Sequence, residues 1–456
     1  MAEPRFGFGA LLLSCAIGIT IGGVYVGQRT RTDKLYQELT SIAEAIDVIQ
    51  RVHVSPPEPQ VLLEDAIAGM VYNLDEYSDY LDEETLRMLN EDTAATYVGI
   101  GIEVAPSPKG AAVVTVFPNS PAAHKHIVPG DIIQRIGDRA LDGLPLDAIV
   151  SLIRGAEGTD VQLHLLRGED ELDVTLTRAR VDMETVSSRM LQDNIAWVRI
   201  HSFSDNILND TRDAIETLRA NNGREFDGLV LDLRGNPGGL LVQAVDIADL
   251  FLDEGTILSV RGIEATIEET WTAKRSDTIY RGPLVVVVDH SSASASELLA
   301  GALQDHDRAT IIGQTSFGKG SVQAVIPLRA GGALKLTTSH YLTPSGRCIH
   351  REGIKPDVVT YDSREEDANP HALPHDVEID AILAEDDMRE REQIGCTEPK
   401  QPPRGAVYHL DVATVNDAYR VFVDDREDAY ISAAVSVLHG AKGTTAPPPA
   451  AERQAP

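Results

Sequence analysis

The sequence predicts a layered α/β protein, and two repeated patterns carry that prediction. Residues 228–233 (GLVLDL) and 284–288 (LVVVV) are short apolar runs, which are typical of strands buried on both faces of a sheet. Each run is followed by a turn rich in glycine or serine and then by an amphipathic helix, expected over 241–251 and from Ser294 onward. Strands that alternate with helices in this way indicate a sheet covered by helices.

Length and charge narrow the class of protein. The 456 residues are enough for two or three domains with real cores. A net charge of −31 argues against nucleic-acid binding, because contact with phosphates needs a basic surface. Three cysteines are too few for a disulfide framework, although Cys348 and Cys396 can pair in an oxidising compartment. No Cys/His spacing typical of a zinc site is present.

The N-terminus contains a candidate membrane segment. Residues 6–26 carry no charge and are long enough to cross a bilayer once. Basic residues after this segment outnumber those before it, so the positive-inside rule alone does not favour an external body. The stretch is a candidate for an uncleaved signal anchor. Lipidation of Cys15 and a plain cleaved signal peptide are the alternatives.

Helices are expected between this segment and the core. Apolar residues recur at helical spacing in 35–52, 61–74 and 83–89, and prolines separate the first two stretches. Residues 32–95 are therefore expected to form a helical N-terminal segment. The region that follows, 96–181, consists mainly of short strand patterns separated by glycine-rich turns, with one amphipathic helix over 146–153.

A serine and a lysine stand at chemically useful places in the core. Ser294 lies where a buried strand turns into a helix, and backbone N–H groups at a helix N-terminus favour negative charge there. A serine is a poor nucleophile until a base takes its proton. Lys319, between two glycines and behind Phe317, can be that base if burial lowers its pKa toward neutrality. On the residues alone, the more common interpretations of these two features are a helix N-cap and a solvated lysine.

The motifs around these two residues resemble those of the C-terminal processing peptidases, also called tail-specific proteases. SASASE, QD and FGKGSVQ follow one another here as in that family, whose lysine stands 25 positions after the serine, as Lys319 does after Ser294. The resemblance implies that Ser294 is the nucleophile, Lys319 the general base and Gln323 the residue that orients the lysine amine. The supporting positions of the family fall here on Glu297, Asp305 and Ser316, where Ser316 replaces the expected threonine.

The resemblance also implies an oxyanion hole. The family phrase DLRGNPGG is intact at residues 232–239. Glycines after a buried strand let backbone N–H groups approach the developing oxyanion, which is usually a large catalytic term. The donors implied are the N–H of Ala295 and that of Gly238 or Gly239. Residues 341–347 also match the family and are expected to shape the floor of the site.

Residues 96–181 resemble a PDZ domain of the circularly permuted bacterial sort. The phrases SPAA and PGDIIQRIG carry this resemblance. It implies that the loop Gly99–Ile102 presents backbone N–H groups to the terminal carboxylate of a peptide, which adds a strand beside it. A regulatory lid is the alternative role. The loop and groove residues expected to contact the peptide are Gly99, Ile100, Gly101, Ile102, Leu146 and Ile149. The apolar members favour ligands with an apolar C-terminal residue.

Together, these resemblances imply a crotonase- or Clp-protease-like layered catalytic core over 182–362 with an inserted PDZ domain. Residues 363–445 are expected to form a C-terminal helical region, and 446–456 a disordered Pro/Ala-rich tail. The expected activity is that of a serine endopeptidase that recognises substrate C-termini and needs no metal or other cofactor. The rival functions are a catalytically silent PDZ scaffold, disfavoured by the intact motif set, and a serine hydrolase of non-peptide esters, disfavoured by the PDZ domain.

Cell location and partners follow from the same resemblance. We expect a single-pass protein of the bacterial cytoplasmic membrane, held by an uncleaved signal anchor over residues 6–26, with residues 1–5 as a cytoplasmic stub. Its catalytic part is expected in the periplasm, where it processes or degrades envelope proteins. Its expected partners are protein or peptide substrates with apolar C-termini, further copies of the same chain in a dimer or larger oligomer, and an adaptor protein.

Overall fold

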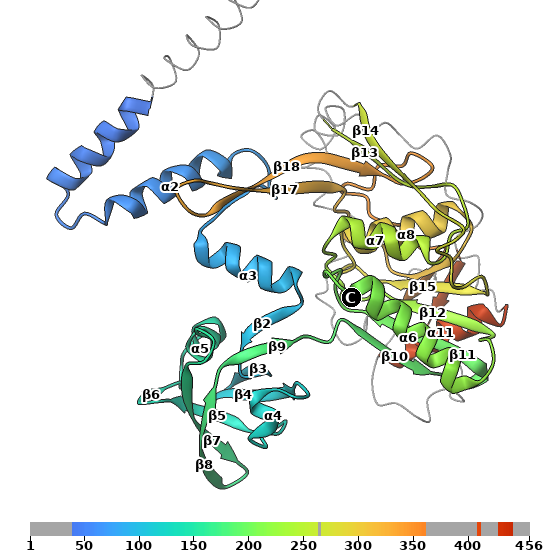
Figure 1. Cartoon of the computed structure of the whole chain (residues 1–456), viewed down its shortest axis with the longest axis horizontal. Helices are drawn as coiled ribbons and strands as arrows, with labels where there is room; N and C mark the ends of the chain where they lie inside the picture. Colours follow the sequence, from blue (N-terminus) through green and yellow to red (C-terminus); the bar gives the residue numbers. More distant parts are fainter. Residues whose placement is uncertain (1–38, 263–265, 362–407, 412–426, 441–456) are drawn as a thin grey trace, which may run out of the picture. The chain divides into compact units, whose positions relative to one another are not determined.

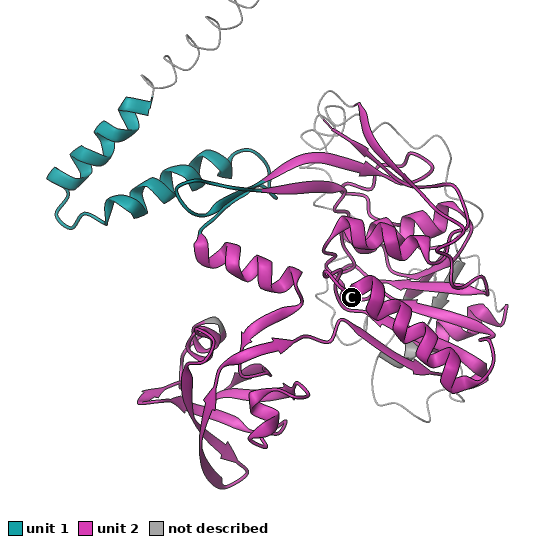
Figure 2. Cartoon of the chain, in the orientation of Figure 1, with its two compact units in different colours: residues 1–82, 326–335 teal, residues 83–325, 336–456 magenta. Residues whose placement is uncertain are grey.

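The computed structural model describes residues 39–262, 266–361, 408–411 and 427–440 (Figure 1). The chain divides into two compact units, which are coloured separately in Figure 2. The first unit contains the described residues up to Asp82 together with Ile326–Lys335. The second contains Glu83–Val325 and the described residues from Leu336 onward.

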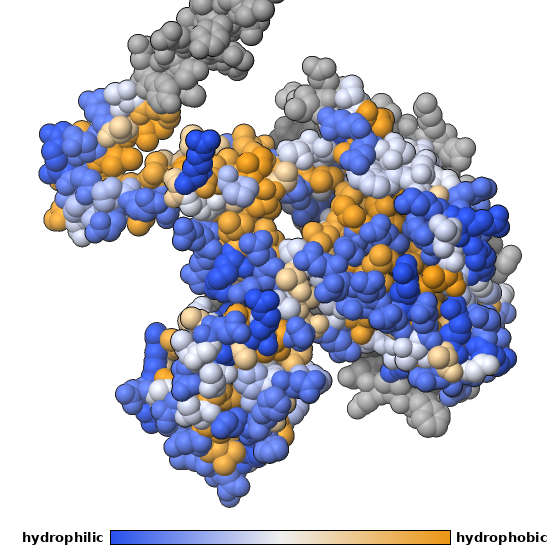
Figure 3. Space-filling model, in the orientation of Figure 1, coloured by the Kyte–Doolittle hydropathy of each residue, from blue (hydrophilic) through white to orange (hydrophobic). Residues whose placement is uncertain are grey.

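The first unit is mainly helical. A helix over 39–52 is followed by α2 (Pro59–Tyr72), which opens with a proline, a residue whose fixed φ suits the first turn of a helix. β1 (Asp79–Leu81) then pairs antiparallel with Ala333–Lys335, the beginning of β18 (Ala333–Leu342). The predicted helices over 35–52 and 61–74 are thus confirmed in their described parts. Large apolar side chains remain exposed along both helices and just after them (Figure 3): Leu39, Val48, Val52, Val54, Val61, Leu63, Met70, Tyr72 and Leu74.

The strand-rich region forms its own sheet and core within the second unit. After α3 (Glu83–Thr93), the chain enters this region through β2 (Thr96–Gly99) and leaves it through β9 (Ala179–Asp182), and these two strands pair antiparallel. The sheet between them has the order β3-β4-β5-β7-β8, with β6 paired to β5. Its strands are β3 (Ile102–Ser107), β4 (Gly110–Val116), β5 (Ile132–Ile136), β6 (Arg139–Ala140), β7 (Asp160–Arg167) and β8 (Asp170–Thr177), and its helices are α4 (Pro121–His124) and α5 (Leu146–Ile153).

The rest of the second unit is built mainly on a sheet of the order β10-β11-β12-β15-β16-β19-β20, in which β10 alone is antiparallel to its neighbour. Its strands are β10 (Val186–Met190), β11 (Ile195–Ile200), β12 (Gly228–Asp232), β15 (Leu284–Val288), β16 (Thr310–Gly313), β19 (Val358–Tyr361) and β20 (Tyr408–Asp411). The 3₁₀ turn η1 (Gln192–Asn194) and the helices α6 (Ile207–Asn222), α7 (Leu241–Asp249), α8 (Ala295–Asp305) and α11 (Glu427–Leu438) complete this layer.

Both faces of this sheet are covered, which explains the uninterrupted apolar runs. Successive side chains of a strand point to opposite faces. In β15, Val286 belongs to the core formed with α6, α7 and α8, whereas Val285 and Val287 pack in a second core with Ile431 and Val435 of α11. A strand buried on both sides cannot alternate polar and apolar residues, so the layered fold predicted from these runs is confirmed.

A smaller sheet contains β13 (Thr256–Arg261), β14 (Ile267–Thr272), β17 (Ser321–Pro327) and β18. β13 pairs antiparallel with β14 and with the end of β18, where Val260 lies opposite Tyr341. This pairing fixes the position of Tyr341.

Several predictions fall outside the described residues. These are the anchor over 6–26, the tail over 446–456 and most of the region 363–445. In the part of the chain that the structure describes, no helix is both long enough and apolar enough to cross a membrane. Cys348 takes part in a disulfide. Its pairing with Cys396 stays a prediction, because Cys396 lies outside the described residues.

Candidate active site

Three loops meet at one edge of the catalytic sheet. They follow β12, β15 and β16, which are parallel neighbours, so their carboxyl ends lie at the same edge. The first loop contains the predicted glycines, the second ends at Ser294, and the third contains Ser316 and Lys319. Residues that are far apart in the sequence are thus brought together by strand order alone.

Ser294 has an unusual backbone conformation. It precedes α8 with φ 54° and ψ −110°, a combination that non-glycine residues seldom adopt. Such conformations cluster at functional sites, where the surrounding structure must hold them in place. Part of that support comes from the Ser294 N–H, which donates to Glu297 Oε2 at 2.8 Å.

Glu297 joins the second and third loops. Its carboxylate is fully buried, and Oε2 also accepts the backbone N–H of Lys319 at 2.8 Å. Oε1 accepts the Ser316 hydroxyl at 2.5 Å and the Gly318 N–H at 2.6 Å. Burial raises the pKa of Glu297 above its ordinary value, and these four hydrogen bonds offset the rise only in part. One buried carboxylate therefore fixes the main chain of both predicted dyad residues.

The first loop lies against the second at Gly238. This residue has φ +103°, and a Cβ added to it would lie 2.9 Å from Ser294 Cβ and 3.0 Å from Ala295 N. Only glycine allows the two main chains to come this close. The Gly238 N–H donates to Asn236 Oδ1 at 2.9 Å, and the Gly238 carbonyl accepts the N–H of Phe203 at 2.9 Å. Because a trans peptide unit points its N–H opposite to its carbonyl, the Gly239 N–H points away from Phe203.

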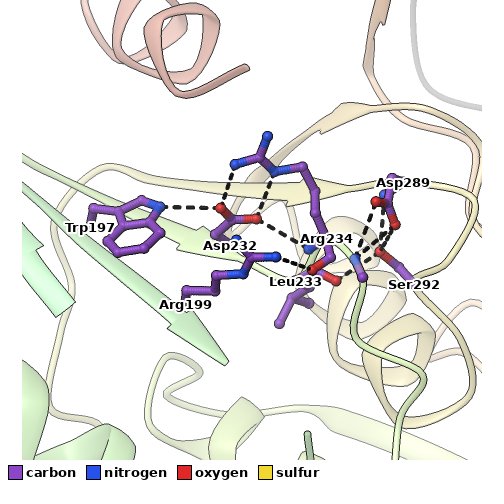
Figure 4. A network of polar contacts seen from close by, with 8 residues as sticks. Trp197, Arg199, Asp232, Leu233, Arg234, Asp289 and Ser292 are labelled. Atoms are coloured by element: carbon purple, nitrogen blue, oxygen red, sulfur yellow. Dashed lines mark hydrogen bonds and ion pairs between the residues drawn. The ribbon is translucent and has the colours of Figure 1, made fainter. Parts of the chain in front are cut away.

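A buried ion pair between Asp232 and Arg234 lies where β12 ends and the first loop begins (Figure 4). Arg234 contacts Asp232 through Nε at 2.9 Å and Nη2 at 2.6 Å, and Trp197 Nε1 donates to the same carboxylate at 3.2 Å. Burial raises the pKa of Asp232, but the hydrogen bonds and charge of Arg234, together with the charge of Arg199, outweigh burial and hold this pKa below its ordinary value. Arg199 Nη2 donates to the Arg234 carbonyl at 3.2 Å.

Asp289 fastens the first loop to the second. Its carboxylate accepts the Gly235 N–H at 3.1 Å and the Ser291 N–H at 3.0 Å. The Ser292 hydroxyl, also drawn in Figure 4, donates to the Leu233 carbonyl at 2.9 Å. Sequence reasoning missed Asp232, Arg234 and Asp289 as members of the site. The available signal was a charged residue at or directly after the end of β12 and of β15.

The remaining predicted core residues lie at the margin of this cluster. Gln323 Nε2 donates to Ser321 Oγ at 2.9 Å and to Thr337 Oγ1 at 3.2 Å, so its role toward the lysine amine stays a prediction. Asp305, the last residue of α8, accepts Arg347 Nη2 at 2.5 Å and the Ser345 N–H at 2.9 Å. Asp305 therefore orders the turn after β18.

In the strand-rich domain, the predicted loop Gly99–Ile102 connects β2 to β3, and Gly101 has φ +80°. Ile100 and Ile149 are each 1% exposed and belong to the domain core, so the side chains that remain partly exposed are those of Ile102 and Leu146. A cavity of about 400 Å³ lies at the other end of β3, lined by Pro106, Ser107, Pro108, Gly110, Asp142, Gly143, Leu144, Pro145, Leu146 and Ile149.

Among the residues that the structure describes, no cluster of His, Cys, Asp or Glu has the arrangement of a metal site. The chemistry available at the loop cluster is that of a hydroxyl beside a helix N-terminus, a lysine and backbone N–H donors. This combination suits acyl transfer.

Comparison with known proteins agrees with this chemistry. Residues 194–360 match peptidase family S41, 98–177 match the PDZ domain, and 23–85 match the N-terminal domain of the activating protease CtpB. A carboxy-terminal-processing protease of Bartonella bacilliformis is 39% identical over 327 residues, which are 71% of this chain and 75% of that protein.

Two further relatives extend the comparison. The carboxy-terminal processing protease CtpA of Bacillus subtilis is 34% identical over 344 residues, 75% of this chain and 72% of that protein. A solved structure of the photosystem II D1 C-terminal processing protease, 30% identical, matches over 72% of this chain and 87% of that one, with a TM-score of 0.44.

A layered α/β core joined to a PDZ domain, with a serine held at a strand-to-helix turn, defines a PDZ-containing serine-type peptidase. The chain belongs to the carboxy-terminal-processing proteases of peptidase family S41. The family assignment and the class of enzyme predicted from the sequence are confirmed.

Proposed function

We propose that Ser294 and Lys319 are the nucleophile and the general base of this peptidase. The observation that carries the proposal is that Glu297 Oε2 accepts the backbone N–H of both residues at 2.8 Å. A carboxylate oxygen can serve both only if the two main chains are neighbours. The reactive side chains of a dyad need such fixed geometry, because small errors of placement cost large factors in rate.

In the proposed reaction, Lys319 Nζ takes the proton of Ser294 Oγ as Oγ attacks the carbonyl carbon of a peptide bond. The same proton then passes to the leaving amine, the C–N bond breaks, and an ester remains on Ser294. Water, deprotonated by Lys319, attacks this ester. The C–O bond to Ser294 breaks, the hydroxyl regains a proton, and the second peptide product leaves.

The tetrahedral oxyanion is stabilised by the backbone N–H groups of Ala295 and Gly239. Ala295 opens α8, where unpaired N–H groups favour negative charge. Of the two glycines left open by the sequence, Gly239 is supported because its N–H points away from Phe203 and the Gly238 N–H is engaged by Asn236. A preorganised donor of this kind is typically worth about 3–4 kcal/mol in the transition state.

The PDZ domain selects substrates by their C-termini. In its sheet β3 is an edge strand, so a peptide can pair with it as an added strand while its carboxylate meets the loop Gly99–Ile102. The partly exposed side chain of Ile102, at the loop end of β3, is apolar and favours an apolar terminal residue. Leu146 lines the cavity at the other end of β3, where residues further from the terminus would lie. Cleavage near such a terminus makes the enzyme a processing or degrading protease for proteins of the bacterial envelope.

Assembly and location complete the proposal. The exposed apolar side chains on the helix over 39–52 and on α2 favour association with a second copy of the chain, since patches of this kind seldom remain in water (Figure 3). The uncharged stretch over 6–26 supports a single membrane anchor with the catalytic part in the periplasm. An adaptor protein is a further partner that delivers substrates.

The test uses the full-length protein in detergent with an unfolded substrate such as casein, beside Ser294→Ala and Lys319→Ala. We expect cleavage by the unchanged protein and by neither variant, with both variants still binding peptides that have apolar C-termini. Cleavage by Ser294→Ala at the unchanged rate would contradict the dyad. Inactivity of all three proteins, even with such peptides added, would favour a silent PDZ scaffold.

A further inference from the structure

We propose that the Tyr341 hydroxyl is a positioning group that clamps the main chains of Ser294 and Lys319 together through their carbonyl oxygens. The proposal rests on the dyad proposed above and extends it to a residue that the sequence assigns only to the floor of the site. Tyr341 contacts backbone atoms of both dyad residues, which makes it a positioning residue and not a catalytic one.

The contact geometry is close on both sides. Tyr341 Oη lies 2.7 Å from the Ser294 carbonyl oxygen and 2.6 Å from the Lys319 carbonyl oxygen. Both distances are normal for O–H···O hydrogen bonds. A phenol has one proton to donate, so the two carbonyls share it. Without that proton, two half-buried carbonyl oxygens would face each other without their shared donor, and of the two the Ser294 carbonyl would keep a second one, the Leu298 N–H at 2.9 Å. The loss costs free energy and favours separation of the two main chains.

Tyr341 is itself held firmly. It stands near the end of β18, opposite Val260 of β13, and its backbone N–H donates to the Gly320 carbonyl at 3.0 Å. Its side chain is 1% exposed and belongs to the main core. The hydroxyl therefore cannot follow the loops if they move. It acts as a fixed point to which both loops are attached.

The clamp complements Glu297. Glu297 accepts the backbone N–H groups of Ser294 and Lys319, whereas Tyr341 donates to the carbonyls of the same two residues. Each dyad residue is thus held at both of its backbone polar groups by the same pair of side chains. This arrangement fixes the distance between the main chains of Ser294 and Lys319, and therefore how closely Ser294 Oγ and Lys319 Nζ can approach each other. A misplacement of 1 Å costs about a hundredfold in rate.

The test compares Tyr341→Phe with Tyr280→Phe in the full-length protein. Tyr280 is a matched control: it is 3% exposed, lies in the same core, and its hydroxyl donates to one carbonyl, that of Pro283, at 3.0 Å. We expect Tyr341→Phe to lower kcat about tenfold or more with KM within about twofold, because positioning acts on the chemical step. Tyr280→Phe should leave kcat unchanged, although both variants lose a similar amount of thermal stability.

A third variant separates the hydroxyl's role from general effects on folding. Replacement of Tyr341 by p-aminophenylalanine keeps the ring and supplies N–H donors at the position of the hydroxyl, so it should restore most of kcat. The proposal is overturned if this variant is as slow as Tyr341→Phe, or if Tyr341→Phe is no slower than Tyr280→Phe. If Ser294→Ala and Lys319→Ala remain active, the dyad itself is wrong, which is a distinct outcome.

Discussion

The hydroxyl of Ser316 lies 2.5 Å from Glu297 Oε1 and donates its proton to that buried carboxylate. The same hydroxyl oxygen accepts the backbone N–H of Ile354 at 2.6 Å. A single small side chain thus connects the carboxylate that holds the proposed dyad residues to the chain beyond β18. The family resemblance leads one to expect threonine at this position, and serine preserves the group that makes both contacts.

Ser316→Ala should destabilise the protein by about 1–3 kcal/mol, because it leaves a buried carboxylate oxygen and a buried N–H with one partner fewer. Ser316→Thr keeps the hydroxyl and should retain activity. Thermal unfolding and casein cleavage measure the two effects. Equal losses in the alanine and threonine variants would show that the hydroxyl is unimportant and that the site tolerates only serine's volume.

Glu297→Gln should reduce kcat by about a hundredfold, because one oxygen acceptor becomes an amide donor that faces other donors and shifts the loops. Glu225→Gln serves as the control, since Glu225 is an exposed carboxylate of the same core that accepts a hydrogen bond from Arg219 Nε at 3.2 Å. Rates of cleavage and of labelling by a serine-directed phosphonate measure the effect. Labelling of Glu297→Gln at the unchanged rate would refute the role given to this carboxylate.

Gly238→Ala should abolish labelling of Ser294, because the new Cβ would lie 2.9 Å from Ser294 Cβ and 2.8 Å from the Ala293 carbonyl oxygen. Gly223→Ala is the matched control. Gly223 also has positive φ, +72°, but a Cβ there would meet no atom within 4 Å, so only the backbone strain of about 1 kcal/mol remains. If both variants label alike, the close approach of the first loop to Ser294 does not matter.

Asp232→Asn should lower the free energy of unfolding by about 3–5 kcal/mol at neutral pH, because the buried charge of Arg234 loses the opposite charge of Asp232. The folded-state pKa of Asp232 lies below its unfolded value, so its stabilisation is present above the unfolded pKa and is lost as pH falls through the folded one. The difference in free energy of unfolding between Asp232→Asn and the unchanged protein should therefore become smaller below about pH 4.

Urea unfolding followed by tryptophan fluorescence measures this difference for the catalytic core alone, since Trp197 and Trp271 are the two tryptophans and both lie there. Asp253→Asn is the control, because Asp253 forms an exposed ion pair with Arg281 and its loss should change stability much less. A difference for Asp232→Asn that stays constant with pH would show that the carboxylate does not titrate as described.

Local pattern was sufficient wherever one physical requirement dominated. The helix expected over 146–153 is α5, and the strand expected over 284–288 is β15, because burial of both faces leaves only apolar residues there. The family resemblance assigned Ser294, Lys319 and Glu297 to one site, and the hydrogen bonds of Glu297 show that their main chains are neighbours, because parallel strands bring the loops after β12, β15 and β16 to one edge. The catalytic roles of Ser294 and Lys319 stay predictions.

Other features depend on contacts that no local pattern encodes. Ile100 was expected in the peptide groove, but its side chain is buried in the PDZ core. The next residue, Gly101, has φ +80° and starts a turn, after which Ile102 is partly exposed. The preference for Gly239 as the proposed oxyanion donor depends on two tertiary contacts: Asn236 accepts the Gly238 N–H, and Phe203 donates to the Gly238 carbonyl. Tyr341 was expected only to shape the floor of the site. Its hydroxyl contacts the carbonyls of Ser294 and Lys319 because β18 pairs with β13, and no local pattern in the sequence indicates that pairing.

The β2–β9 pair has a consequence for how such enzymes diversify. Ala95 and Met183, at the outer end of this pair, are hydrogen-bonded neighbours, with the Met183 N–H 2.9 Å from the Ala95 carbonyl oxygen. The first and last residues of the PDZ region are therefore neighbours in space. Recombination that exchanges this insert leaves both junctions in register, so a new substrate preference can be acquired in one genetic step while the hydrolytic machinery is inherited unchanged.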